Sequence, residues 1–208
     1  MTGIQEPILS GTENAFSDWQ EEDTVEGVLL EDRDLTGEDL QGREWRQCIF
    51  RRCRFSEQDL TRAGFTDCLF EKCEMDNCRM EEAVLRRVRF TSCRLTGSDL
   101  NGALLRDVRF VSCKAELSNF SESRLEHVEF ENTVMREAAL EQVKMKNAAF
   151  TGCDMTGAVL AYTPLSGLDM RTDILDGINV RPEDLRGLTV THDQAALLAV
   201  LLGTRIRE

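Results

Sequence analysis

The strongest constraint on this chain is an apolar residue at every fifth position. From Leu30 to Leu185, all 32 positions whose numbers are multiples of five are apolar, and Ala115 is the only small residue among them. An α-helix repeats its apolar face every three to four residues, and a flat strand repeats it every two. Because a period of five matches neither, the chain must turn a corner between successive repeats.

The largest side chains indicate how many corners make one coil. Phenylalanine recurs every twenty residues, and this series holds six of the ten phenylalanines. Four repeats therefore close one coil, and like residues stack on like. Ten of the fourteen glycines lie two residues after an apolar centre, where a tight turn needs a positive φ that glycine adopts without steric cost. The phenylalanines in the series are Phe50, Phe70, Phe90, Phe110, Phe130 and Phe150.

A second inward position lies two residues before each centre, and it holds all eight cysteines. From Ala63 to Leu168, 21 of its 22 residues are Ala, Cys, Ser, Thr or Val. The cysteines have no CxxC spacing, so we expect buried thiols that act as small hydrophobes and no zinc site. Bridges between stacked cysteines are the alternative, which a cytosolic setting disfavours. The eight are Cys48, Cys53, Cys68, Cys73, Cys78, Cys93, Cys113 and Cys153.

Individual repeats include RDLTG at 33–37, SDLNG at 98–102 and CDMTG at 153–157. This pattern resembles the repeats of the pentapeptide-repeat family. The resemblance implies an all-β fold, a right-handed quadrilateral parallel β-helix, which agrees with the corner count. At twenty residues a coil, the repeat region makes about eight coils, and a C-terminal α-helix follows it.

The C-terminal helix is indicated by its cap and its composition. Thr191 and Gln194 have the spacing of a capping box, Ala195–Leu202 is an unbroken apolar run, and Gly203 can end the helix. One apolar face can cover the last coil, and the other needs a second copy, so we expect a homodimer. The alternative is a cap folded wholly under Thr204–Arg207. The expected dimer interface comprises Ala195, Leu197, Leu198, Leu201 and Leu202.

The two ends depart from the repeat and divide the chain into three segments. Residues 1–24 carry Phe16 and Trp19 among acidic residues, which favours an amphipathic cap over the first coil, with an acidic tail as the alternative. Residues 25–187 form the repeat β-helix, and 188–208 form the dimerisation helix and a short strand at Thr204–Ile206. With no signal-peptide pattern and no membrane-length apolar run, we expect a cytoplasmic protein without membrane contact.

Charge is distributed unevenly around the coil. The formal net charge is −13 at pH 7. In residues 33–187, the two neighbouring sides centred on Leu35 and Leu40 and their repeats together carry −9, and the other two sides carry +5. A solvated face is one interpretation; the other is a surface for a protein with a basic groove, since nucleic acid would be repelled. The candidate acidic partner-binding face comprises Asp39, Asp59, Glu74, Asp76, Asp99 and Asp154.

The residues contain no pattern that predicts catalysis. His127 and His192 have no nucleophile or metal-ligand partner at a recognisable spacing. We therefore expect no enzyme activity, no catalytic residues, no cofactor and no metal.

The segment HDQAALL at 192–198, followed by Leu202 and Gly203, resembles the dimerisation segment of the quinolone-resistance pentapeptide proteins, the MfpA and Qnr group. In that group two rods meet end to end, and the acidic dimer mimics DNA and occupies the DNA-binding saddle of DNA gyrase. The chain lacks the projecting loops of the Qnr branch and is closer to the MfpA-like branch. The resemblance implies a gyrase-binding DNA mimic that modulates gyrase, or protects it from quinolones or natural topoisomerase toxins. The alternative is a cytoplasmic scaffold or adaptor unrelated to gyrase.

Overall fold

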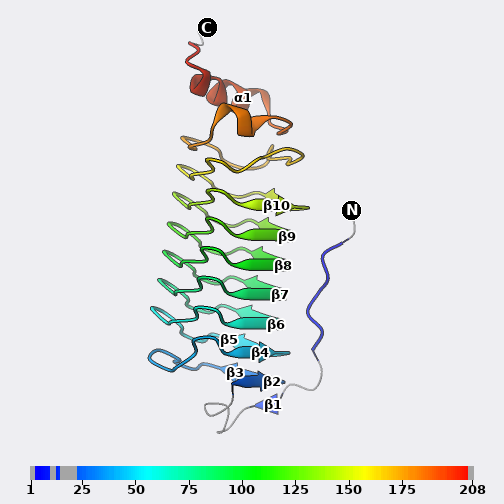
Figure 1. Cartoon of the computed structure of the whole chain (residues 1–208), viewed down its shortest axis with the longest axis vertical. Helices are drawn as coiled ribbons and strands as arrows, with labels where there is room; N and C mark the ends of the chain where they lie inside the picture. The colour runs from blue at the N-terminus through cyan, green and yellow to red at the C-terminus, as the bar shows by residue number, and fades with distance from the viewer. Residues whose placement is uncertain (1–2, 10–12, 15–22, 206–208) are drawn as a thin grey trace.

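The chain winds into a rod of stacked coils, with α1 (His192–Ala199) at one end (Figure 1). The structure is a computed structural model that describes residues 3–9, 13–14 and 23–205. Equivalent residues of adjacent coils pair in parallel at a spacing of twenty, as Phe70 does with Phe90 and Phe90 with Phe110. The four-sided parallel β-helix predicted from the sequence is confirmed.

Regular strands form on two neighbouring sides of the coil only. The other two sides are joined by isolated bridges, such as Arg54 with Glu74 and Arg79 with Asp99. In the middle coils each strand covers both strand-bearing sides and bends at a residue with positive φ, for example Asp67. The strands are β1 (Glu13–Asn14), β2 (Thr24–Glu26), β3 (Val28–Glu31), β4 (Glu44–Arg46), β5 (Ile49–Arg51), β6 (Gly64–Glu71), β7 (Val84–Thr91), β8 (Leu104–Val111), β9 (Arg124–Glu131), β10 (Lys144–Lys146) and β11 (Ala149–Thr151).

The number of turns is slightly smaller than predicted. Six successive pairings lead from Leu30 in β3 to Phe150 in β11, so the strand ladder makes about six turns and not eight. Beyond β11 the chain keeps the coil path through isolated bridges, the last joining Asp169 to Thr189. Pro164 stands one coil above Lys144, whose N–H donates to the Ser123 carbonyl. Because proline has no N–H, the ladder cannot continue at that position.

The predicted centres form the core. Of the 32 residues, all except Met145 and Leu185 are buried, and these two are partly buried against the core. The phenylalanine series forms a continuous stack in which the rings of Phe90 and Phe110 lie 4.8 Å apart and nearly parallel. Stacking of like on like, inferred from the period of twenty, is confirmed.

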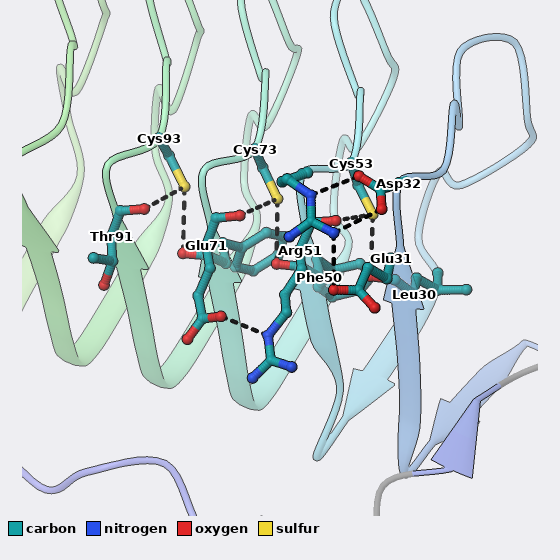
Figure 2. A network of polar contacts seen from close by, with 12 residues as sticks. Leu30, Glu31, Asp32, Phe50, Arg51, Cys53, Glu71, Cys73, Thr91 and Cys93 are labelled. Atoms are coloured by element: carbon teal, nitrogen blue, oxygen red, sulfur yellow. Dashed lines mark hydrogen bonds and ion pairs between the residues drawn. The ribbon is translucent and has the colours of Figure 1, made fainter.

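The cysteines form columns beside this stack. Figure 2 shows Cys53, Cys73 and Cys93 in line, with their sulfurs directed at backbone carbonyls of the coils. The Cys73 thiol donates to the Phe50 carbonyl over 3.3 Å. All eight cysteines are buried and free, and burial raises the pKa of the Cys78 thiol to about 12. The eight cysteines are therefore small buried core residues, as predicted.

The structure describes both chain ends only in part. Phe16, Trp19 and Ile206 lie outside the described residues, and Thr204 and Arg205 form no strand. Residues 3–9, which we call the strap, run along the side of the rod in a direction opposite to the stacking of the coils (Figure 1). In the described part of the chain, no helix has the length and apolarity needed to cross a membrane.

Candidate protein-binding surfaces

The terminal helix is fixed to the last coil by its first turn. The predicted capping box is present: the Gln194 N–H donates to Thr191 Oγ1 over 3.2 Å, and the Thr191 N–H donates to Gln194 Oε1 over 2.7 Å. The side-chain amide of Gln194 also donates through Nε2 to the backbone carbonyls of Met170 and Asp173, over 2.8 and 2.7 Å. The short 3₁₀ helix η3 (Val200–Leu202) follows, and Gly203 ends it with φ 73°. These bonds orient the helix on the rod.

The outer face of this end is apolar and exposed. Ala195, Leu197, Leu201 and Leu202 of the predicted interface are exposed, and Leu202 has 64% of its surface accessible. Leu198 is only 8% exposed and belongs to the core, so its place in the predicted interface is corrected. Leu198 follows Gln194 by four residues and therefore lies on the same helix face, toward the coil. Val200, exposed and missed by the prediction, joins the outer face.

A buried carboxyl lies beneath this helix. Asp173 Oδ1 accepts the Cys153 N–H over 2.7 Å, and Oδ2 is buried with no hydrogen-bond partner in the described part of the chain. Burial raises the pKa of Asp173 above its ordinary value. A raised folded-state pKa means that the stability associated with this group is present at low pH and is lost as the pH rises through that value.

We therefore expect Asp173→Asn to raise the thermal unfolding midpoint at about pH 8 and to change it much less at about pH 4, because a raised pKa favours the neutral carboxyl at low pH. Calorimetry at both pH values checks this. Asp176→Asn, which changes an exposed carboxylate in the same coil, is the matched control. An equal shift at both pH values for Asp173→Asn would show that the charge is not the cause.

The predicted acidic face lies outward, but its carboxylates are mostly paired with arginines. The arginine stands on an adjacent coil. Asp59 lies 2.6 Å from Arg79, and Asp154 lies 2.6 Å from Arg136. Glu74 and Asp76 both pair with Arg94. None of the six candidates is buried.

Asp39 and Asp99 are the two candidates without an ion pair among the described residues. Asp99 accepts a hydrogen bond from the Asn119 amide over 3.0 Å. Part of this pairing could be read from the sequence, because opposite charges twenty residues apart, such as Asp59 and Arg79, lie on adjacent coils. The pairs of Asp76 and Asp154 have a spacing of eighteen residues and do not follow this rule. The structure thus keeps an acidic excess on these sides, although part of it is neutralised locally.

The two strand-bearing sides are the basic ones, and the strap lies on them. The Gln5 N–H donates to Asp107 Oδ1 over 3.2 Å, and the Ile8 N–H donates to Asp67 Oδ1 over 3.0 Å. Glu6 pairs with Arg109 at 2.6 Å and with Arg89 at 3.3 Å. Sequence reasoning missed this contact because it joins residues 59 to 103 positions apart that share no repeat.

Each histidine lies beside an aspartate. His127 Nδ1 lies 3.8 Å from Asp107 on the rod wall, and His192 is exposed beside Asp193. Within the described ranges, no group of three or more His, Cys, Asp or Glu side chains is placed to hold a metal ion.

The family model that matches the sequence agrees with this repeat architecture. The family model for the pentapeptide repeat region matches residues 43–120 and 87–158. No curated protein matches the sequence. Among solved structures, a trypsin-treated variant of QnrB1, a plasmid-mediated fluoroquinolone resistance protein, is 18% identical over 89% of this chain and 100% of that chain, with a TM-score of 0.44.

Two further solved structures are similar. HetL is a pentapeptide repeat protein involved in heterocyst differentiation regulation from the cyanobacterium Nostoc sp. strain PCC 7120; it is 14% identical over 80% of this chain and 86% of its own, with a TM-score of 0.44. A pentapeptide repeat protein of the Arabidopsis thaliana thylakoid lumen is 21% identical over 62% of this chain and 66% of its own, with a TM-score of 0.28. The family-model match spans more than half of the sequence, and the chain belongs to the pentapeptide-repeat family.

Proposed function

We propose that this protein is a DNA-mimicking ligand of DNA gyrase, which it modulates or protects from quinolones or natural topoisomerase toxins. The supporting observation is the segregation of charge around the rod. Two neighbouring sides have an acidic excess, and Asp39 and Asp99 on these sides form no ion pair among the described residues. A long surface with one sign of charge attracts a groove of the opposite sign.

The exposed apolar end supports the joining of two rods end to end, and the resulting longer assembly imitates a duplex. Leu197, Val200 and Leu202 are exposed on the outer face of the terminal helix. Apolar patches of this kind mark protein interfaces, and a second copy buries the same patch on both partners. The proposed active species is a homodimer of two rods joined end to end.

A gyrase supercoiling assay tests the proposal. Purified protein is added to gyrase and relaxed plasmid, with and without a quinolone. The expected result is inhibition of supercoiling by the protein alone, or reduced quinolone-stabilised cleavage in its presence. Bovine serum albumin at equal concentration controls for nonspecific protein effects. Unchanged supercoiling and unchanged cleavage would contradict the proposal.

The second candidate function is a scaffold or adaptor for another protein. It is favoured by the ion pairs of Asp59, Glu74, Asp76 and Asp154 with arginines on adjacent coils, which reduce the field that an acidic mimic requires. A negative gyrase assay combined with retained dimerisation favours this function.

A further inference from the structure

The strap is extended, and its sequence explains why. Glu6 precedes Pro7, and the residue before a proline is driven out of the helical region. The strap runs across the strands and along the rod axis (Figure 1), so it does not extend a sheet by edge pairing. Side chains of the rod hold it.

The main-chain contacts of the strap match the repeat of the rod. Its two anchors, Asp67 and Asp107, occupy equivalent corners two coils apart and are each 6% exposed. Two coils span about 9.6 Å, and three extended residues, the separation of the Gln5 and Ile8 N–H donors, span about 10 Å. Pro7 lies between the donors and has no N–H to satisfy. Any extended peptide with donors three residues apart fits these corners.

The side-chain contact selects a carboxylate. Arg89 and Arg109 are direct neighbours on β7 and β8, where like charges repel. The single oxygen Glu6 Oε1 contacts both, at 3.3 and 2.6 Å. The groove formed by Asp67, Asp107, Arg89 and Arg109, which we call the corner groove, therefore recognises an acidic residue directly after the first anchored N–H.

The strap leaves a hydrogen-bond donor of the corner groove unused. Arg89 Nε is buried and has no acceptor among the described residues. Past the first residues of the strap, a cavity of about 700 Å³ is lined by Gly3, Ile4, His127, Asn147, Arg171 and Thr172, among others. Ile8 remains 62% exposed and adds little apolar contact. The cavity lies beside the corner groove and not within it, so the unused binding capacity of the groove itself is the Nε donor of Arg89.

We propose that the corner groove is a binding site for an extended acidic peptide segment of a partner protein, and that the strap occupies it as a built-in competitor. A tethered segment has an effective concentration of about millimolar. A partner must therefore either bind tightly or present a second carboxylate to displace it. This inference concerns the basic sides and is independent of the target of the acidic sides.

The test uses the full chain and a synthetic peptide with the sequence of residues 3–9, GIQEPIL. Glu6→Lys places a cation against Arg89 and Arg109 and should release the strap. Titration of the ¹⁵N-labelled protein should show peptide binding at the amides of Asp67 and Asp107. The affinity for Glu6→Lys should be about tenfold or more above that for the wild type, because the tethered competitor is gone.

Two controls make the result specific. Glu131→Lys has the same charge change on the basic sides at an exposed residue, and it should bind the peptide as weakly as the wild type. A peptide with Gln in place of Glu should bind Glu6→Lys about tenfold more weakly, since the charge-assisted contact is lost. Equal binding of the two peptides, or no binding to Glu6→Lys, would overturn the proposal. A wild-type dimer that dissociates on Glu6→Lys would show exchange of straps between copies and would also overturn it.

Discussion

Replacing Phe110 by alanine is expected to lower the free energy of unfolding by about 3 to 5 kcal/mol, the usual cost of emptying a buried phenylalanine site. Phe110 is fully buried and stacks between Phe90 and Phe130, with ring centroids 4.8 Å away on both sides. Phe120 meets the same ring edge-on at 5.9 Å. Coils above and below cannot close the gap without giving up their strand pairing, so a cavity remains.

Urea unfolding followed by far-ultraviolet circular dichroism measures this effect. Leu117→Ala is the control, because Leu117 is a large but exposed apolar residue of the same coil, and the change should stay within about 0.5 kcal/mol. A loss below about 1 kcal/mol for Phe110→Ala would mean that the stack does not form a rigid core.

The double substitution Leu197→Asp with Leu202→Asp is expected to convert the proposed dimer into monomers. Both leucines are exposed on the outer face of the rod end, and burying two carboxylates in an apolar interface without partners is strongly unfavourable. Leu198 is unsuitable for this test, because it belongs to the core and its replacement would unfold the cap.

Sedimentation equilibrium at micromolar concentration distinguishes the two states. Leu104→Asp with Leu117→Asp introduces the same charge at exposed leucines on the rod wall and should leave the dimer intact. A monomeric wild type would refute end-to-end dimerisation and favour the cap alternative.

The fold was predictable because one repeat determines nearly every inward position. The register placed the core at residues such as Phe70 and Leu95, and both are fully buried. The number of turns was harder to predict, because the apolar register continues past Pro164 although the missing N–H interrupts the strand ladder there. Apolar periodicity reports the direction of side chains, whereas strands also require backbone donors.

The candidate sites were less predictable than the fold. The position of the helix was predicted correctly. Because the predicted helix is apolar on all sides, its sequence does not indicate which face is covered. The hydrogen bonds of Gln194 to the last coil orient the helix so that Leu198 lies inward. The strap could not be foreseen, because its contacts with Asp67 and Asp107 depend on the path of a segment outside the repeat. Local patterns carry no information about such a path.

The most direct test of the proposed function measures the affinity of the protein for gyrase after charge reversal on the acidic sides. Asp39→Lys with Asp99→Lys reverses the two candidates that lack an ion pair in the described structure. Glu26→Lys with Glu131→Lys makes the same change in net charge at exposed residues of the strand-bearing sides. Titration at low and moderate salt, monitored by fluorescence anisotropy of labelled protein, compares both variants with the wild type.

If the acidic sides replace DNA phosphates, the first variant should lose about tenfold or more in affinity, the control should lose little, and wild-type binding should weaken steeply with salt. Equal affinities of the two variants for gyrase, or wild-type binding that does not respond to salt, would contradict DNA mimicry.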